Sequence, residues 1–164
     1  MEKTIHFFVN HKTIFENNSE AIISDFLRNA DVFFNASMYL LKGCFNTTTD
    51  PNSTEYLIPA GFLAARSAEY YLKGLILSFE PNVAFYEKCH DSSHDLGKLL
   101  GILEILDNEA KSLELAISNL DKYSGEKVSY PEPAYYKNFP DSFGSDEISC
   151  VKIIKSFVYK KLDW

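Results

Sequence analysis

An apolar segment over residues 56–79 constrains this chain more than any other feature. It includes the run GFLAARSAEYYLKGLILSF, whose charged side chains are Arg66, Glu69 and Lys73. Their spacings of three and four residues place them on one side of an α-helix. The segment therefore predicts a largely buried helix with one polar stripe, which ends before Pro81.

Apolar residues at helical spacing predict four further helices. These run from Ala21 to about Cys44 after a start signal at Asn18-Ser19-Glu20, from Ser92 through Leu103, from the Asp107-Asn108-Glu109 cap to Leu120, and from about Ser145 to Leu162. Residues 82–91 show no such pattern and are expected to be irregular. Residues 124–144 are rich in proline and aromatic residues, and predict a long aromatic loop before the last helix.

These segments predict an all-α protein, an antiparallel (up-and-down) helical bundle of about five helices. We expect one bundle domain over residues 19–164, preceded by an N-terminal arm over residues 1–18 that begins in an extended form. A length of 164 residues suits a single domain with its own core. The small numbers of Gly (7) and Pro (6) favour helices over a many-turned β-sandwich.

Charge and cysteine usage argue against several classes of protein. The net charge is −7, and only Arg28 and Arg66 are arginines among 16 basic residues, so bulk binding of DNA or RNA backbones is not expected. Three scattered cysteines without CxxC spacing indicate reduced thiols and a cytoplasmic location. The N-terminus lacks a signal-peptide pattern, and no uncharged apolar run approaches the length of a membrane span.

The stripe of Arg66, Glu69 and Lys73 has two interpretations. In a groove of the bundle it could hold an anionic ligand such as a nucleotide phosphate, with Glu69 orienting Lys73. Alternatively, Glu69 and Lys73 form an intrahelical ion pair, worth about 0.3–0.5 kcal/mol if exposed.

His94 and Asp95 also have two interpretations. A histidine oriented by a carboxylate can act as a general base, whereas at a helix start Asp95 favours the dipole and His94 packs over the cap. His90 and His94 could share a metal only on one helix. Because the start signal at Ser92 puts His90 before the helix, no metal site is predicted. Tyr130 and its aromatic neighbours could stack bases, or pack over the bundle or across a dimer.

The order of these segments resembles the HEPN domain (higher eukaryotes and prokaryotes nucleotide-binding) over roughly residues 19–162. The motifs that carry the resemblance are Ala68-Glu69 and Leu72-Lys73 in the apolar helix, His94-Asp95-Leu96 at the next helix start, and Tyr130-Pro131 before the last helix. The resemblance implies an antiparallel bundle that usually dimerises. The family includes toxin ribonucleases, partners of minimal nucleotidyltransferases, and nucleotide- or RNA-binding accessory domains.

The chain departs from the ribonuclease branch of that family. Activity there depends on an arginine followed four to six residues later by a histidine, near the last helix. Neither Arg28 nor Arg66 is followed by such a histidine, and residues 145–164 contain neither residue type. The family's Tyr-Pro pair often follows an arginine, which is Ser129 here. The resemblance therefore implies the fold without the ribonuclease motif.

Three functional hypotheses result. The first is a non-catalytic HEPN-like module, a homodimer that uses no cofactor and binds a nucleotide, RNA or a protein partner such as a nucleotidyltransferase. Its expected ligand-binding residues are Arg66, Glu69, Lys73, His94, Asp95 and Tyr130. The second is a divergent, toxin-like ribonuclease in which folding brings Arg66 and His94 together. The third is a purely structural oligomerisation domain.

Overall fold

The computed structural model describes residues 11–46, 57–92, 94–124 and 144–163, and within them every regular element is a helix. The elements are α1 (His11–Asn46), α2 (Leu57–Phe79), α3 (Val83–Asp91), α4 (Leu96–Leu106), the 3-10 helix η2 (Asn108–Leu113), α5 (Glu114–Asp121) and α7 (Ser145–Lys161). The predicted all-α class is confirmed for these ranges. No helix in them is both long and apolar enough to cross a membrane. The predicted aromatic loop, with Tyr130, lies outside the described residues.

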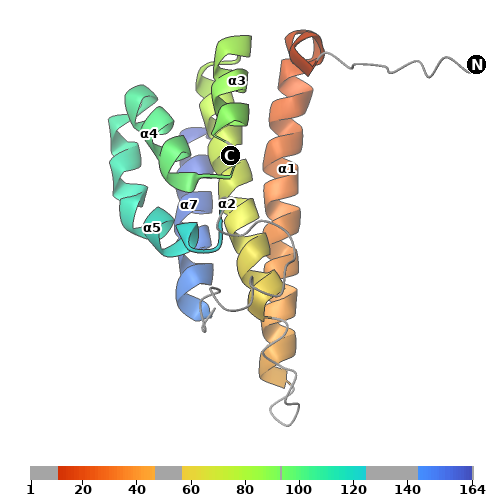
Figure 1. Cartoon of the computed structure of the whole chain (residues 1–164), viewed down its shortest axis with the longest axis vertical. Coiled ribbons are helices and arrows are strands. Elements are labelled where there is room, and N and C mark those ends of the chain that lie inside the picture. Colours follow the sequence, from red (N-terminus) through yellow and green to blue (C-terminus); the bar gives the residue numbers. More distant parts are fainter. Residues whose placement is uncertain (1–10, 47–56, 93, 125–143, 164) are drawn as a thin grey trace, which may run out of the picture.

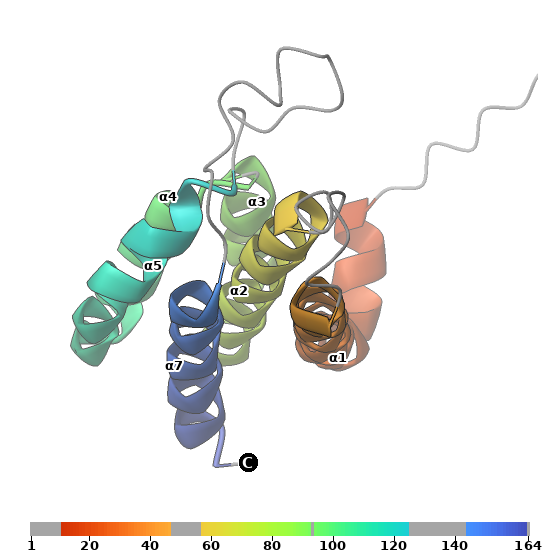
Figure 2. The ribbon, with the colours of Figure 1, turned by 90° about the horizontal axis from the view of Figure 1, so that it is seen from below.

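Helix α2 lies at the centre of the molecule. Figures 1 and 2 show α1 at one edge, α4 and α5 at the opposite edge, and α2 and α7 between them. Helix α2 packs against α1, α4 and α7. Its core side chains include Ala64, Ala68, Tyr71, Leu72, Leu75 and Ile76, all with no exposed surface. Contacts on several sides explain why this segment is apolar nearly all round, and its predicted bounds are confirmed to within one residue.

Residues 82–91, expected to be irregular, instead form α3. The Asn82 side chain caps the helix, because its Oδ1 accepts the Phe85 N–H at 3.1 Å. Val83, Tyr86 and Cys89 follow at spacings of three and pack on the core. A helix of nine residues offers too few turns for this pattern to stand out in the sequence.

The start of the next helix also differs from the prediction. Ser92 closes α3, since its Oγ donates to the Lys88 carbonyl at 2.7 Å. Asp95 is the N-cap of α4, where its Oδ1 accepts the Lys98 N–H at 2.9 Å. The predicted cap at Asp107 is confirmed, with Oδ1 accepting the Glu109 N–H at 3.0 Å, although the first turns that follow are 3-10 rather than α-helical.

The predicted N-terminal arm is wrong for residues 11–18, which belong to α1. Phe15 is buried and stacks on Tyr86 of α3, with ring centroids 4.5 Å apart. This tertiary contact draws the segment into the helix. The expected start signal at Asn18 is instead a kink, where φ is −142° and ψ is 29°. The other predicted arm residues lie outside the described ranges.

A carboxylate on α1 joins three helices. Asp31 accepts hydrogen bonds from Lys155 Nζ at 2.6 Å, from Tyr159 OH at 2.6 Å and from Tyr71 OH. Burial by itself raises the pKa of Asp31, but the bonds from Lys155, Tyr159 and Tyr71 outweigh it and hold that pKa below its usual value. Burial, together with Asp31, raises the pKa of Tyr71, which stays a donor. This set fixes α1 and α7 against α2.

We expect Gly74→Ala to destabilise the protein, although alanine favours helices. A Cβ at Gly74 would lie 2.7 Å from Cδ2 and 3.0 Å from Cγ of the buried Leu27, where α1 and α2 approach closely. Overpacking costs about 1–3 kcal/mol and outweighs a propensity gain of about 1 kcal/mol. The control is Gly101→Ala, where a Cβ meets nothing within 4 Å and the same gain remains. Urea unfolding should give changes of opposite sign, and a stabilised Gly74→Ala would contradict the close approach.

Candidate functional site

The charged stripe of α2 forms a partly buried cluster around one carboxylate. Glu69 Oε2 accepts from Arg66 Nη1 at 2.7 Å, and Glu69 Oε1 accepts from Lys73 Nζ at 2.7 Å. His94 completes this set, which we call the charged cluster (Arg66, Glu69, Lys73 and His94). The Nδ1 atom of His94 lies 3.2 Å from Oε2 and 3.3 Å from Oε1 of Glu69, and it also contacts Arg66 Nη1.

The connection between α3 and α4 brings His94 to α2. Ser92 ends α3, its carbonyl accepts the Asp95 N–H at 3.0 Å, and Asp95 then caps α4. This short turn holds His94 beside residues far away in sequence. With a proton on Nδ1 the imidazole can donate to Glu69, and without one it can accept from Arg66.

The cluster has a buried part and an exposed part. The side chains of Glu69 and Lys73 are 4% and 11% exposed, whereas those of Arg66 and His94 are 22% and 44% exposed. An incoming ligand would therefore meet Arg66 and His94 first, with Glu69 behind them. The hydrogen bonds to the fixed Glu69 carboxylate hold the side chains that would contact a ligand in one orientation.

Cys89 of α3 lies close enough to Lys73 for the lysine charge to lower the pKa of the thiol. Burial raises the pKa of the Cys89 thiol to about 11, and Lys73 offsets only part of this effect. The thiol is therefore protonated near neutral pH, and a protonated, buried thiol is a poor nucleophile. Cys89 thus contributes packing to this region rather than chemistry.

Cationic side chains outnumber carboxylates among the described residues of the charged cluster. Two permanent cations, Arg66 and Lys73, pair there with the one carboxylate of Glu69. The whole chain, in contrast, has a net charge of −7. The Arg66 guanidinium also lies over the Phe62 ring, 4.8 Å from its centroid, which fixes the plane of its donors. This arrangement can hold a phosphate or carboxylate group.

The structure brings together four of the six expected ligand-binding residues. Asp95 lies apart from them, because it caps α4 and pairs with Lys98 at 3.5 Å. Tyr130 lies outside the described residues. Sequence reasoning missed Phe62, although its position four residues before Arg66 places the two on one helix face.

His90 was expected to precede a helix, but it lies in the last turn of α3. It is exposed and pairs with Asp91 at 3.8 Å, whereas His94 follows beyond the turn at Ser92. Across the described side chains, no group of three or more His, Cys, Asp or Glu residues is arranged to hold a metal ion.

Comparison with known proteins gave no match to a family model, a curated protein or a solved structure.

Proposed function

We propose that this chain is a non-catalytic, HEPN-like module that binds a phosphate-bearing ligand, a nucleotide or RNA, at the charged cluster. The observation that carries the proposal is the pair of partly exposed, nitrogen-bearing side chains, Arg66 and His94, that lies over the buried carboxylate of Glu69. An antiparallel, HEPN-like order of helices, a homodimer and a protein partner of the nucleotidyltransferase type belong to the same proposal.

The chemistry of the cluster supports a phosphate ligand over a cationic one. Arg66 retains N–H donors beyond the one that Glu69 accepts, and guanidinium donors match phosphate oxygens in pairs. His94 adds an imidazole nitrogen that can donate to a phosphate oxygen. The Phe62 ring under Arg66 gives a planar surface beside the phosphate position, which suits a base or ribose.

We expect Arg66→Met to weaken binding of ATP, or of a short single-stranded RNA, by about tenfold or more. The substitution removes the partly exposed cation and keeps an apolar side chain on Phe62, while Glu69 keeps its pair with Lys73. Isothermal titration measures ATP binding, and fluorescence anisotropy measures RNA binding. Arg66 is a better position than Lys73 for this test, because Lys73 is buried and its loss would disturb Glu69.

The matched control is Arg28→Met, the chain's other arginine. Arg28 is exposed on α1 and pairs with Asp25 at 2.9 Å, outside the charged cluster. The Arg28→Met variant should bind ATP and RNA as tightly as the wild type does. Equal losses in the two variants would mean non-specific attraction and would contradict the proposal. If the wild type bound neither ligand, the structural oligomerisation domain would be the better description.

The contact between Arg66 and His94 also favours a second candidate, the divergent ribonuclease. These residues are 28 positions apart, yet Nη1 and Nδ1 meet. A histidine can accept the proton of a ribose 2′-OH, an arginine can stabilise charge on the phosphate, and Glu69 can orient the imidazole. The RNA recovered from the binding experiment separates the two functions. If the wild type cleaves the RNA, and His94→Ala binds it equally well without cleaving it, the protein is a ribonuclease. If the wild type binds the RNA and leaves it intact, the non-catalytic binding module is supported.

A further inference from the structure

A groove between α4 and α5 lies at the edge of the molecule opposite α1. It encloses about 300 Å³. Leu100 of α4 and Ile117 of α5 form its apolar floor, and two of the four α4 positions that line it, Gly97 and Gly101, have no side chain. No other described helix covers this edge of the molecule in Figures 1 and 2.

The residues that line the groove follow one helical spacing on both sides. Helix α4 contributes positions 97, 100, 101 and 104, and α5 contributes positions 114, 117, 118 and 121. Each set is spaced i, i+3, i+4 and i+7, so the groove extends along two turns of each helix. A surface between two helices with this periodicity accepts the side-chain ridge of a third helix.

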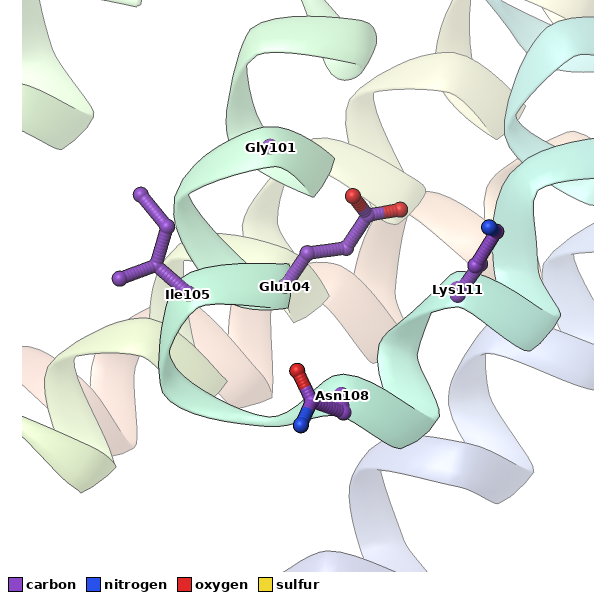
Figure 3. A pocket seen from close by; sticks show the side chains of 5 residues that line it. All are labelled: Gly101, Glu104, Ile105, Asn108 and Lys111. Atoms are coloured by element: carbon purple, nitrogen blue, oxygen red, sulfur yellow. The ribbon is translucent and has the colours of Figure 1, made fainter.

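The hollow continues around the outer face of α4. Gly101 also lines two neighbouring hollows of about 470 Å³ each. Figure 3 shows one of them, where Glu104 extends toward η2 and Ile105 points to the other side of α4. Ile105 is 83% exposed, and Leu115 of α5 is 75% exposed. Each of the two helices that line the groove therefore also presents one large apolar side chain to water.

Charge identifies the occupant of this groove. The described residues that line the groove itself include three acidic side chains, Glu104, Glu114 and Asp121, and no basic one. The lysines nearby, Lys88, Lys98 and Lys111, line the two neighbouring hollows instead. An apolar floor with an acidic rim matches a helix that has apolar side chains on one face and Lys or Arg on both flanks. In the charged cluster on α2, cationic side chains outnumber carboxylates among the described residues, so a phosphate ligand there would not compete for this surface.

We infer that the α4–α5 groove docks a basic amphipathic helix of a partner protein. The partner's apolar side chains would lie on Leu100 and Ile117, and its backbone would approach α4 at Gly101. Its Lys or Arg side chains would pair with Glu104 and Asp121. The absence of side chains at the glycines permits closer approach than a larger residue would, as in other small-residue helix contacts.

The experiment uses the ¹⁵N-labelled full chain and a designed helical peptide of about five turns. The peptide has Leu and Ala on one face and Lys on both flanks, and a second peptide has Glu in place of each Lys. Binding is measured by amide chemical shifts and by fluorescence anisotropy. The Lys peptide should bind, shift the amides of residues 97–104 and 114–121, and weaken as salt is added. The Glu peptide should not bind.

Gly101→Leu separates docking in the groove from general attraction to an acidic protein. It fills the hollow without changing charge, and it should weaken binding of the Lys peptide by about tenfold or more. A Cβ at Gly101 meets nothing within 4 Å, so the melting temperature should be kept or raised. Gly43→Leu is the matched control, since a Cβ there also meets nothing within 4 Å. Wild-type affinity in Gly101→Leu, no binding of the Lys peptide, or equal binding of the Glu peptide would overturn the inference.

Discussion

Glu69→Ala should lower the free energy of unfolding by about 3 kcal/mol. Glu69 accepts from both Arg66 and Lys73, and its side chain is almost fully buried. Removing it takes away the carboxylate that accepts from both Arg66 and the buried Lys73, and breaking a buried ion pair is far more costly than losing a surface pair. Urea unfolding monitored by circular dichroism measures the change.

Two variants test this explanation. Glu69→Met combined with Lys73→Met replaces the pair with apolar side chains of similar size and should recover most of the lost stability. Glu114→Ala removes an exposed glutamate and should change stability by less than about 0.5 kcal/mol. If Glu69→Ala were as mild as Glu114→Ala, water would have to reach Lys73, and the cluster would not be a buried ion pair. The double variant removes Glu69 and Lys73 from the charged cluster but leaves Arg66 and His94, so a ligand-binding test of this variant shows whether the buried pair is needed to orient them.

Asp31→Asn should lower the free energy of unfolding by about 2 kcal/mol near neutral pH. The substitution removes the charge that Lys155, Tyr159 and Tyr71 share, and leaves the fully buried Tyr71 with a weaker acceptor. This loss of free energy of unfolding is smaller than for a fully buried ion pair, because the side chains of Asp31 and Lys155 are each 33% exposed. Asp25→Asn, in an exposed pair on the same helix, is the control and should be nearly neutral.

The difference between wild type and Asp31→Asn should disappear in acid. The pKa of Asp31 is lower in the folded protein than its unfolded value of about 3.9. A depressed folded pKa gives stability that is fully present above the unfolded value, and that is lost as the pH falls through the folded value. Urea unfolding at about pH 7, 5 and 3 would follow this loss. A difference that grew toward acid would mean that the charge of Asp31 is not what holds the three helices.

Long helices with strong signals were predictable from the sequence. Residues 56–79 are apolar on nearly every side because α2 contacts α1, α4 and α7, and α7 begins at Ser145 as expected. The short helical segments were not predictable from the sequence. Helix α3 depends on the Asn82 cap, and the first turns of α1 depend on the stacking of Phe15 on Tyr86, a contact that no local sequence pattern indicates.

The candidate site was predictable in part, because three of its four residues lie on one long helix. Helical spacing alone places Arg66, Glu69 and Lys73 together. The approach of His94 to Glu69 depends on how α3 ends and α4 begins. The sequence pattern predicts a helix start at Ser92, whereas Ser92 ends α3 and Asp95 caps α4. The α4–α5 groove depends on a contact between two helices and on the space above Gly101, which the pattern of a single helix cannot indicate.

The kink at Asn18 separates residues 11–17 from the rest of α1, and we expect the two parts to open separately. Residues 11–17 are anchored by one buried ring, Phe15, while the rest of α1 packs along α2 and carries Asp31. Opening the first part breaks the stack on Tyr86 and leaves the interface between α1 and α2 intact. Its amide hydrogens therefore exchange with solvent through local opening, whereas those near Asp31 exchange only when the core of the protein unfolds.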